Sequence, residues 1–151
     1  MKKIFKILVI AFCVFSFWVL PTFADVNQTF TFLWEQSTDD LANLREWRLY
    51  IGFASGGPYT AAKDVNGADI VIPYDSADTD GNYTSAQTMV IPGASGTTVN
   101  AYFVLTAVDN EGYQTAYSNQ AVDESTGNDY IVIKLPIGRP FSVKVQVQTG
   151  N

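Results

Sequence analysis

The stretch "FVLTAVDNEGYQTAYSN", residues 103–119, carries the clearest structural pattern in the chain. Its first six residues alternate between two faces, as in a β-strand, and one of these faces holds Phe103, Leu105 and Ala107. The four residues 109–112, Asp-Asn-Glu-Gly, are typical of a tight turn, and a second extended run follows. The stretch therefore predicts a β-hairpin.

Similar patterns predict further strands on both sides of this hairpin. Apolar side chains alternate with polar ones in 30–34 and again in 47–51, and a polar connection between them, 37–46, has room for one helical turn. A short strand is expected at 70–72 within a long exposed excursion, 61–86, and another strand in "AQTMVIP", 86–92. Short strands with almost no helix predict an all-β fold, a β-sandwich.

The first 24 residues, "MKKIFKILVIAFCVFSFWVLPTFA", are typical of a secretory signal peptide. Lysines precede an apolar run, and small residues stand at the end, so we expect cleavage after Ala24. The mature protein is then secreted, periplasmic or held at a cell surface, and makes no membrane contact. A retained membrane anchor over 4–20 is one alternative. A lipid on Cys13 is another, although Phe12 stands where such a signal needs a small residue.

The remaining composition excludes several classes of function. Residues 25–151 contain no cysteine and no histidine, which removes thiol nucleophiles and the common zinc, copper and haem ligands. They carry fifteen acidic and six basic residues, a balance that argues against nucleic acid as a partner. We expect a protein that is not an enzyme and has no cofactor. A hydrolase that uses carboxylates alone is the alternative, with Asp39–Asp40, Asp109 with Glu111, or Asp123–Glu124 as the acid and base.

Two further sets of side chains are candidate binding residues. Asp75, Asp78 and Asp80 precede a glycine in an acidic loop and could offer oxygen ligands to calcium, although the charged first and last positions of a calcium loop are missing. Exposed tyrosines could stack on sugars or pack against a protein. The candidates for such a surface are Tyr50, Tyr59, Tyr83, Tyr102, Tyr113 and Tyr117.

Trp34, the run "WRLYIGFASGGPYT" (47–60) and the run "VLTAVDNEGYQTAYSN" (104–119) resemble a fibronectin type III domain, as found in short exported proteins of bacteria and phages. The resemblance implies an immunoglobulin-like sandwich over 25–124, in which Trp34 packs between the sheets and 113–122 forms the seventh strand. Ala101 stands where the family places a corner tyrosine, and Tyr102 is expected to face outward. The function implied is adhesion, binding or spacing, with a surface protein or polysaccharide as the partner.

The resemblance leaves the first strand of the family unfilled, because too few residues separate Ala24 from the strand that carries Trp34. Residues 125–151 form a C-terminal β extension with an apolar run at 130–135 and a clean alternation at 141–147. We expect 141–147 to cover the open sheet edge of its own chain, since the linker of roughly 18 residues can reach back across one domain. That arrangement favours a monomer. The alternative is donation of this strand to a neighbouring chain, which gives an oligomer.

Overall fold

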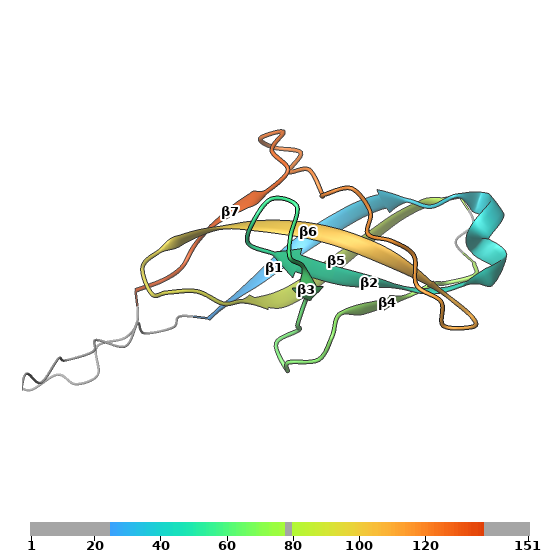
Figure 1. Ribbon diagram of the computed structural model, residues 1–151, viewed down its shortest axis with the longest axis horizontal. Helices are drawn as coiled ribbons and strands as arrows, with labels where there is room; N and C mark the ends of the chain where they lie inside the picture. The colour runs from blue at the N-terminus through green and yellow to red at the C-terminus, as the bar shows by residue number, and fades with distance from the viewer. Residues whose placement is uncertain (1–24, 78–79, 138–151) are drawn as a thin grey trace, which may run out of the picture.

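Two antiparallel sheets pack face to face in the computed structural model, which describes residues 25–77 and 80–137 (Figure 1). The first sheet pairs β1 (Val26–Glu35) with β5 (Asn82–Ile91). The second sheet is built on β2 and β6, with β3 and β4 paired to β2, and β7 paired to β6. These strands are β2 (Leu44–Gly52), β3 (Thr60–Ala61), β4 (Val71–Pro73), β6 (Thr98–Asp109) and β7 (Ile131–Lys134). The prediction of an all-β sandwich is confirmed.

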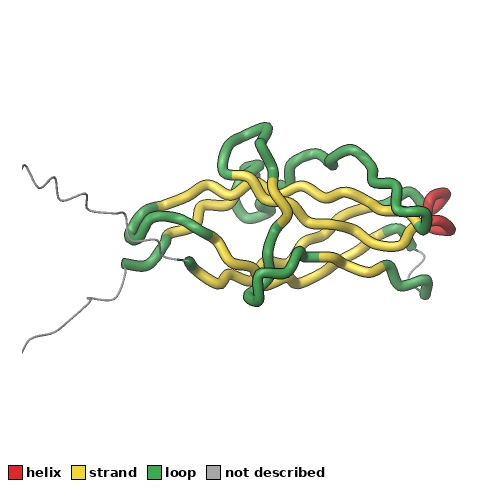
Figure 2. The backbone as a smooth tube through the Cα atoms, turned by 60° about the horizontal axis from the view of Figure 1, so that its bottom comes forward, coloured by secondary structure: helices red, strands yellow, loops and turns green. Residues whose placement is uncertain are grey.

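A short 3₁₀ helix, η1 (Thr38–Asn43), crosses from β1 to β2 at one end of the sandwich (Figure 2). It lies in the connection where a single helical turn was expected. Ser37 precedes it but makes no side-chain cap, and the backbone N–H of Asp40 donates to the Ser37 carbonyl instead.

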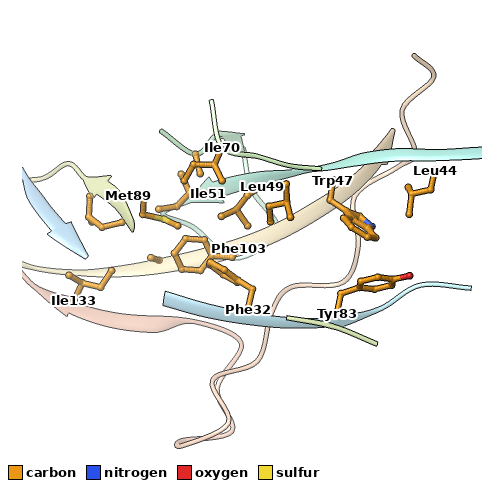
Figure 3. Close-up of a cluster of buried hydrophobic side chains, with 14 of the residues drawn as sticks. Phe32, Leu44, Trp47, Leu49, Ile51, Ile70, Tyr83, Met89, Phe103 and Ile133 are labelled. Atoms are coloured by element: carbon orange, nitrogen blue, oxygen red, sulfur yellow. The ribbon is translucent and has the colours of Figure 1, made fainter. Parts of the chain in front are cut away.

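The core lies between the two sheets, where Phe32 and Tyr83 of the first sheet point toward Trp47 and Phe103 of the second (Figure 3). The Phe32 and Phe103 rings lie 5.2 Å apart, and those of Trp47 and Tyr83 4.6 Å apart. Each large apolar side chain buried in this way contributes about 1.5–3 kcal/mol. The alternation expected at 30–34 and 47–51 is present, and all three expected core positions of β2 are buried: Trp47, Leu49 and Ile51.

β5 is longer than predicted, because it begins at Asn82 rather than near residue 86. The extra residues pair with the end of β1, and Tyr83 lies opposite Trp34 in the register. Their rings are stacked, with centroids 5.8 Å apart. Cross-strand aromatic contact therefore draws a polar stretch into the sheet, and the exposed excursion expected over 61–86 ends earlier than predicted.

The expected seventh strand, 113–122, is not a β-strand, and we call it the edge segment. It runs beside β6 with an irregular spacing: the N–H of Thr115 donates to the Ala107 carbonyl, and the N–H of Ser118 to the Leu105 carbonyl. Three residues of the edge segment thus span two residues of β6. A regular antiparallel ladder needs equal spacing on both chains, so no strand forms.

The apolar run expected at 130–135 forms β7, which pairs with the first residues of β6. Much of the linker proposed from the sequence is therefore part of the sandwich. The signal peptide, residues 1–24, and the alternating stretch 141–147 lie outside the described residues.

On β2, Glu46 lies between two arginines, and its carboxylate accepts hydrogen bonds from Arg45 and from Arg48, the latter at 2.8 Å from Nη2. The hydrogen bond from Arg45, together with that from Arg48 and the charge of both, lowers the pKa of Glu46. A lowered folded-state pKa adds stability above the unfolded pKa and loses it as the pH falls through the folded value.

Replacing Glu46 by glutamine should therefore lower stability at pH 7 by about 1 kcal/mol or less, because the pair is partly exposed. The difference from wild type should disappear at acid pH. Melting temperatures of both proteins between about pH 7 and pH 2.5 test this linkage. Glu124→Gln, which removes an exposed carboxylate, is the control, and a Glu46→Gln deficit that is equally large at both ends of the range contradicts the prediction.

Candidate binding groove

A groove of about 610 Å³ opens between β1 and the edge segment. A volume of this size is typical of ligand pockets. Both sheets contribute apolar side chains to its lining, and the edge segment forms one wall. The apolar lining residues with the largest side chains are Phe32, Leu33, Trp34, Trp47, Leu49, Phe103 and Leu105.

The groove follows an unpaired strand edge. Within the described residues, β1 pairs only with β5, so its other edge has no neighbouring strand. Every second residue of an antiparallel strand directs its N–H and C=O away from its partner, so this edge of β1 offers backbone donors and acceptors. The groove is thus a channel with both polar and apolar lining residues, and it runs beside a set of unused strand hydrogen bonds.

Trp34 adds an unsatisfied donor to the groove lining. Its ring packs edge-on against Trp47, with centroids 5.1 Å apart, and its Nε1 is buried with no hydrogen-bond partner in the described parts of the chain. Trp47, by contrast, donates its Nε1–H to Gln36 at 3.3 Å. A buried donor left unpaired costs about 1–3 kcal/mol.

On the other side of the groove, hydroxyl groups of the edge segment already accept hydrogen bonds from backbone N–H groups of β6. The N–H of Leu105 donates to Ser118 Oγ, and the N–H of Ala107 donates to Thr115 Oγ1, both at 3.0 Å. These hydroxyls stand where a neighbouring strand would place carbonyl oxygens. Among the described residues, β1 is therefore the strand beside the groove whose outer edge has no neighbouring strand. The sequence pattern did not single out Thr115 and Ser118, since the residues of this run were interpreted as a regular strand.

Of the predicted tyrosine surface, three members come together. The Tyr117 ring lies 5.1 Å from that of Tyr50 and 5.3 Å from that of Tyr59. The Tyr59 hydroxyl donates to Gln120, and the Tyr50 hydroxyl accepts from Gln114, so these tyrosines hold the edge segment against β2 and β3.

The other three predicted tyrosines do not join that cluster. Tyr83 is buried in the core, where it packs against Trp34 and Trp47, so it forms no surface. Tyr102 lies outside the core cluster, as expected for a residue that faces outward, but the Tyr130 ring covers it at 5.7 Å and leaves it buried. Tyr113 is 72 % exposed.

The acidic loop is described only in part. Asp75 accepts the N–H of Ala77, and Asp80 accepts the N–H of Asn82, at 2.9 and 2.8 Å, so both carboxylates stabilise local turns. Asp78 lies outside the described residues. Across 25–77 and 80–137 no group of three or more metal-binding side chains comes together, and calcium binding stays a prediction.

The three candidate carboxylate pairs also occupy turns. Asp109 accepts the N–H groups of Glu111 and Tyr113, which closes the turn after β6. Hydrogen bonds from Ser125 and then Thr126 lower the pKa of Asp123, the opposite of what a general acid needs. Asp39 and Asp40 lie exposed in the first turn of η1.

No family model, no curated protein and no solved structure matches the chain. In the described residues no helix has the length and apolar character needed to cross a membrane.

Proposed function

We propose that this chain is a non-catalytic exported β-sandwich module of the fibronectin type III kind, which recognises a protein at a cell or virion surface. The partner inserts one extended strand into the groove beside β1. The observation that carries the proposal is the edge of β1, which has no neighbouring strand among the described residues and lies next to a groove with apolar side chains in its lining.

The geometry of strand addition fits this site. A bound strand forms backbone hydrogen bonds with β1, and every second side chain of the strand points into the groove. Trp34 and Leu105, which line the groove and are partly exposed, then contact those side chains. Affinity comes from the backbone pairing and from apolar burial, and specificity comes from the sizes of the alternating side chains.

The fibronectin type III assignment is supported by the order in which the residues pack. Trp34 on β1 contacts Trp47 on β2 between the two sheets, with ring centroids 5.1 Å apart. Protein recognition is favoured over polysaccharide recognition, because Tyr50 and Tyr59 use their hydroxyls within the chain and pack their rings against Tyr117.

A synthetic peptide of about eight residues that alternates threonine and valine tests the proposal. We expect it to bind the dilute full-length exported protein and to slow the hydrogen exchange of β1 amides. The same peptide with alternate backbone amides methylated keeps its side chains but loses strand donors, and its affinity should fall about tenfold or more.

A matched pair of variants locates the site. Ala116 is exposed and lines the groove, whereas Ala54 is exposed and lies away from it. Ala116→Arg should weaken peptide binding, and Ala54→Arg, with the same change of size and charge, should not. Equal binding of the methylated and unmethylated peptides, or equal binding by the two variants, would refute the proposal.

A further inference from the structure

We propose that the strand inserted into the groove is residues 141–147 of a second copy of this chain, so that the protein assembles head to tail. The inference rests on the proposed function and names its partner. It draws on the groove, on the place where the chain leaves the sandwich, and on the sequence that follows.

The chain leaves the sandwich at the end where β1 begins (Figure 1). β7 runs toward this end, and the N–H of Gly96 then donates to the Pro136 carbonyl at 3.1 Å. Only residues 138–140 separate Ile137, the last described residue, from Phe141. The stretch that follows is thus tied closely to one end of the sandwich.

Residues 141–147 have the pattern that the groove requires. Phe141, Val143, Val145 and Val147 share one face of an extended chain, and polar residues occupy the other. Seven residues at about 3.3 Å each extend roughly 23 Å, which is shorter than the ten residues of β1. The strand therefore fits along β1 without overhanging it.

The direction of entry favours a second copy. A strand folded back on its own chain enters at the Val26 end and runs parallel to β1, which leaves Phe141 far from the groove residues 32–36. A strand from another copy can enter at the Glu35 end and run antiparallel, which brings Phe141 beside Trp34 and Trp47. Antiparallel pairing is also slightly more stable per residue than parallel pairing.

Charge favours the same contact. Residues 138–151 contain Arg139 and Lys144 and no acidic residue, whereas residues 25–137 contain fifteen acidic and four basic residues. Glu35 lines the groove at the expected entrance. A basic strand and an acidic acceptor attract one another, so assembly should weaken as salt is added.

Each copy would donate from one end and accept in its groove, which is a contact between two different surfaces. Such a contact does not close on itself unless the rotation between copies forms a ring, and it otherwise builds a linear polymer. Assembly would then follow mass action, with larger species at higher concentration.

The first experiment compares two variants of the full-length exported protein with the same added charge. Val143→Asp/Val145→Asp places two carboxylates on the apolar face, and Ser142→Asp/Gln146→Asp places them on the polar face. Light scattering after size exclusion should show wild type and the polar-face variant growing at least twofold in mean mass between about 1 and 100 µM. The apolar-face variant should stay monomeric with an unchanged circular dichroism spectrum.

A second experiment tests the direction of entry with cysteines on separate molecules of the exported protein, residues 25–151, which contain no cysteine of their own. Mixing Glu35→Cys protein with Ser142→Cys protein should give a disulfide-linked heterodimer under mild oxidation. Mixing Asn27→Cys protein with Ser142→Cys protein should give several-fold less. Equal yields from the two mixtures would overturn the antiparallel placement.

Two outcomes of the first experiment would overturn the inference. One is identical assembly by the apolar-face and polar-face variants. The other is a wild type that is monomeric at every concentration and is destabilised by the apolar-face substitutions, which places 141–147 in its own groove. The alternating peptide separates the two proposals when either of these outcomes is found. If the apolar-face variant then binds the peptide, the groove function stands and self-assembly alone fails. If that variant does not bind the peptide, the groove function fails as well.

Discussion

Replacing Phe103 by alanine should lower the free energy of unfolding by about 3–5 kcal/mol, the range measured for buried phenylalanines. Phe103 is 1 % exposed, and its ring lies 5.2 Å from both Phe30 and Phe32 of the facing sheet. The substitution would remove the main aromatic contact between β6 and β1 and leave a cavity that neighbouring strands cannot fill. Denaturant unfolding followed by tryptophan fluorescence measures the loss.

The matched control is Phe53→Ala, which removes the same atoms from a side chain that is 44 % exposed. That change should cost about 1 kcal/mol, because nearly half of this side chain stays in water in the folded protein. Since a domain of this size has about 5–15 kcal/mol of total stability, the loss is a large part of it and should lower the melting temperature by roughly 10 °C or more. A Phe103→Ala protein as stable as Phe53→Ala would mean that the two sheets do not pack through this ring.

The sequence predicted the strands whose apolar and polar residues alternate, and it missed those stabilised by partners distant in the chain. The alternation in β1 and β2 reflects one buried face, so it is visible without any knowledge of neighbours. The start of β5, by contrast, is polar apart from Tyr83, and it forms a strand because Tyr83 stacks on Trp34. The edge segment has strand-like residues but takes an irregular path.

The sequence predicted the candidate site only as a missing strand at the edge of one sheet. Counting residues before Trp34 predicted a missing first strand, and β1 has an unpaired edge among the described residues. The groove itself depends on how far the edge segment lies from β1, a distance that no local pattern encodes. Tyr50, Tyr59 and Tyr117 illustrate the same limit, since their meeting depends on the pairing of β2 with β3 and on the edge segment.

Replacing Leu135 by alanine should lower the free energy of unfolding by about 2–5 kcal/mol and loosen β7 from the sandwich. Leu135 is 1 % exposed, and its N–H donates to the Thr97 carbonyl at 2.8 Å. It follows β7 directly, so it fixes the point from which residues 138–151 leave the body. Val132→Ala, on the 59 % exposed side chain of the same strand, is the control and should cost less than about 1 kcal/mol.

A double-mutant cycle with Gly93 shows whether Leu135 acts through this contact. A Cβ atom on residue 93 would lie only 2.1 Å from Leu135 Cδ1, so Gly93→Ala alone should overpack the site and cost about 1–3 kcal/mol. In the Leu135→Ala background the same methyl group enters the space that the leucine leaves. The double variant should therefore be more stable than the two single losses predict when added, by about 1 kcal/mol or more. Strict additivity would contradict the packing of Leu135 against Gly93. This contact adds to the pairing of β7 with β6 and to the backbone hydrogen bonds of Leu135 and Pro136. Together they hold the C-terminal end of β7 at the end of the sandwich from which we propose that the donated strand begins.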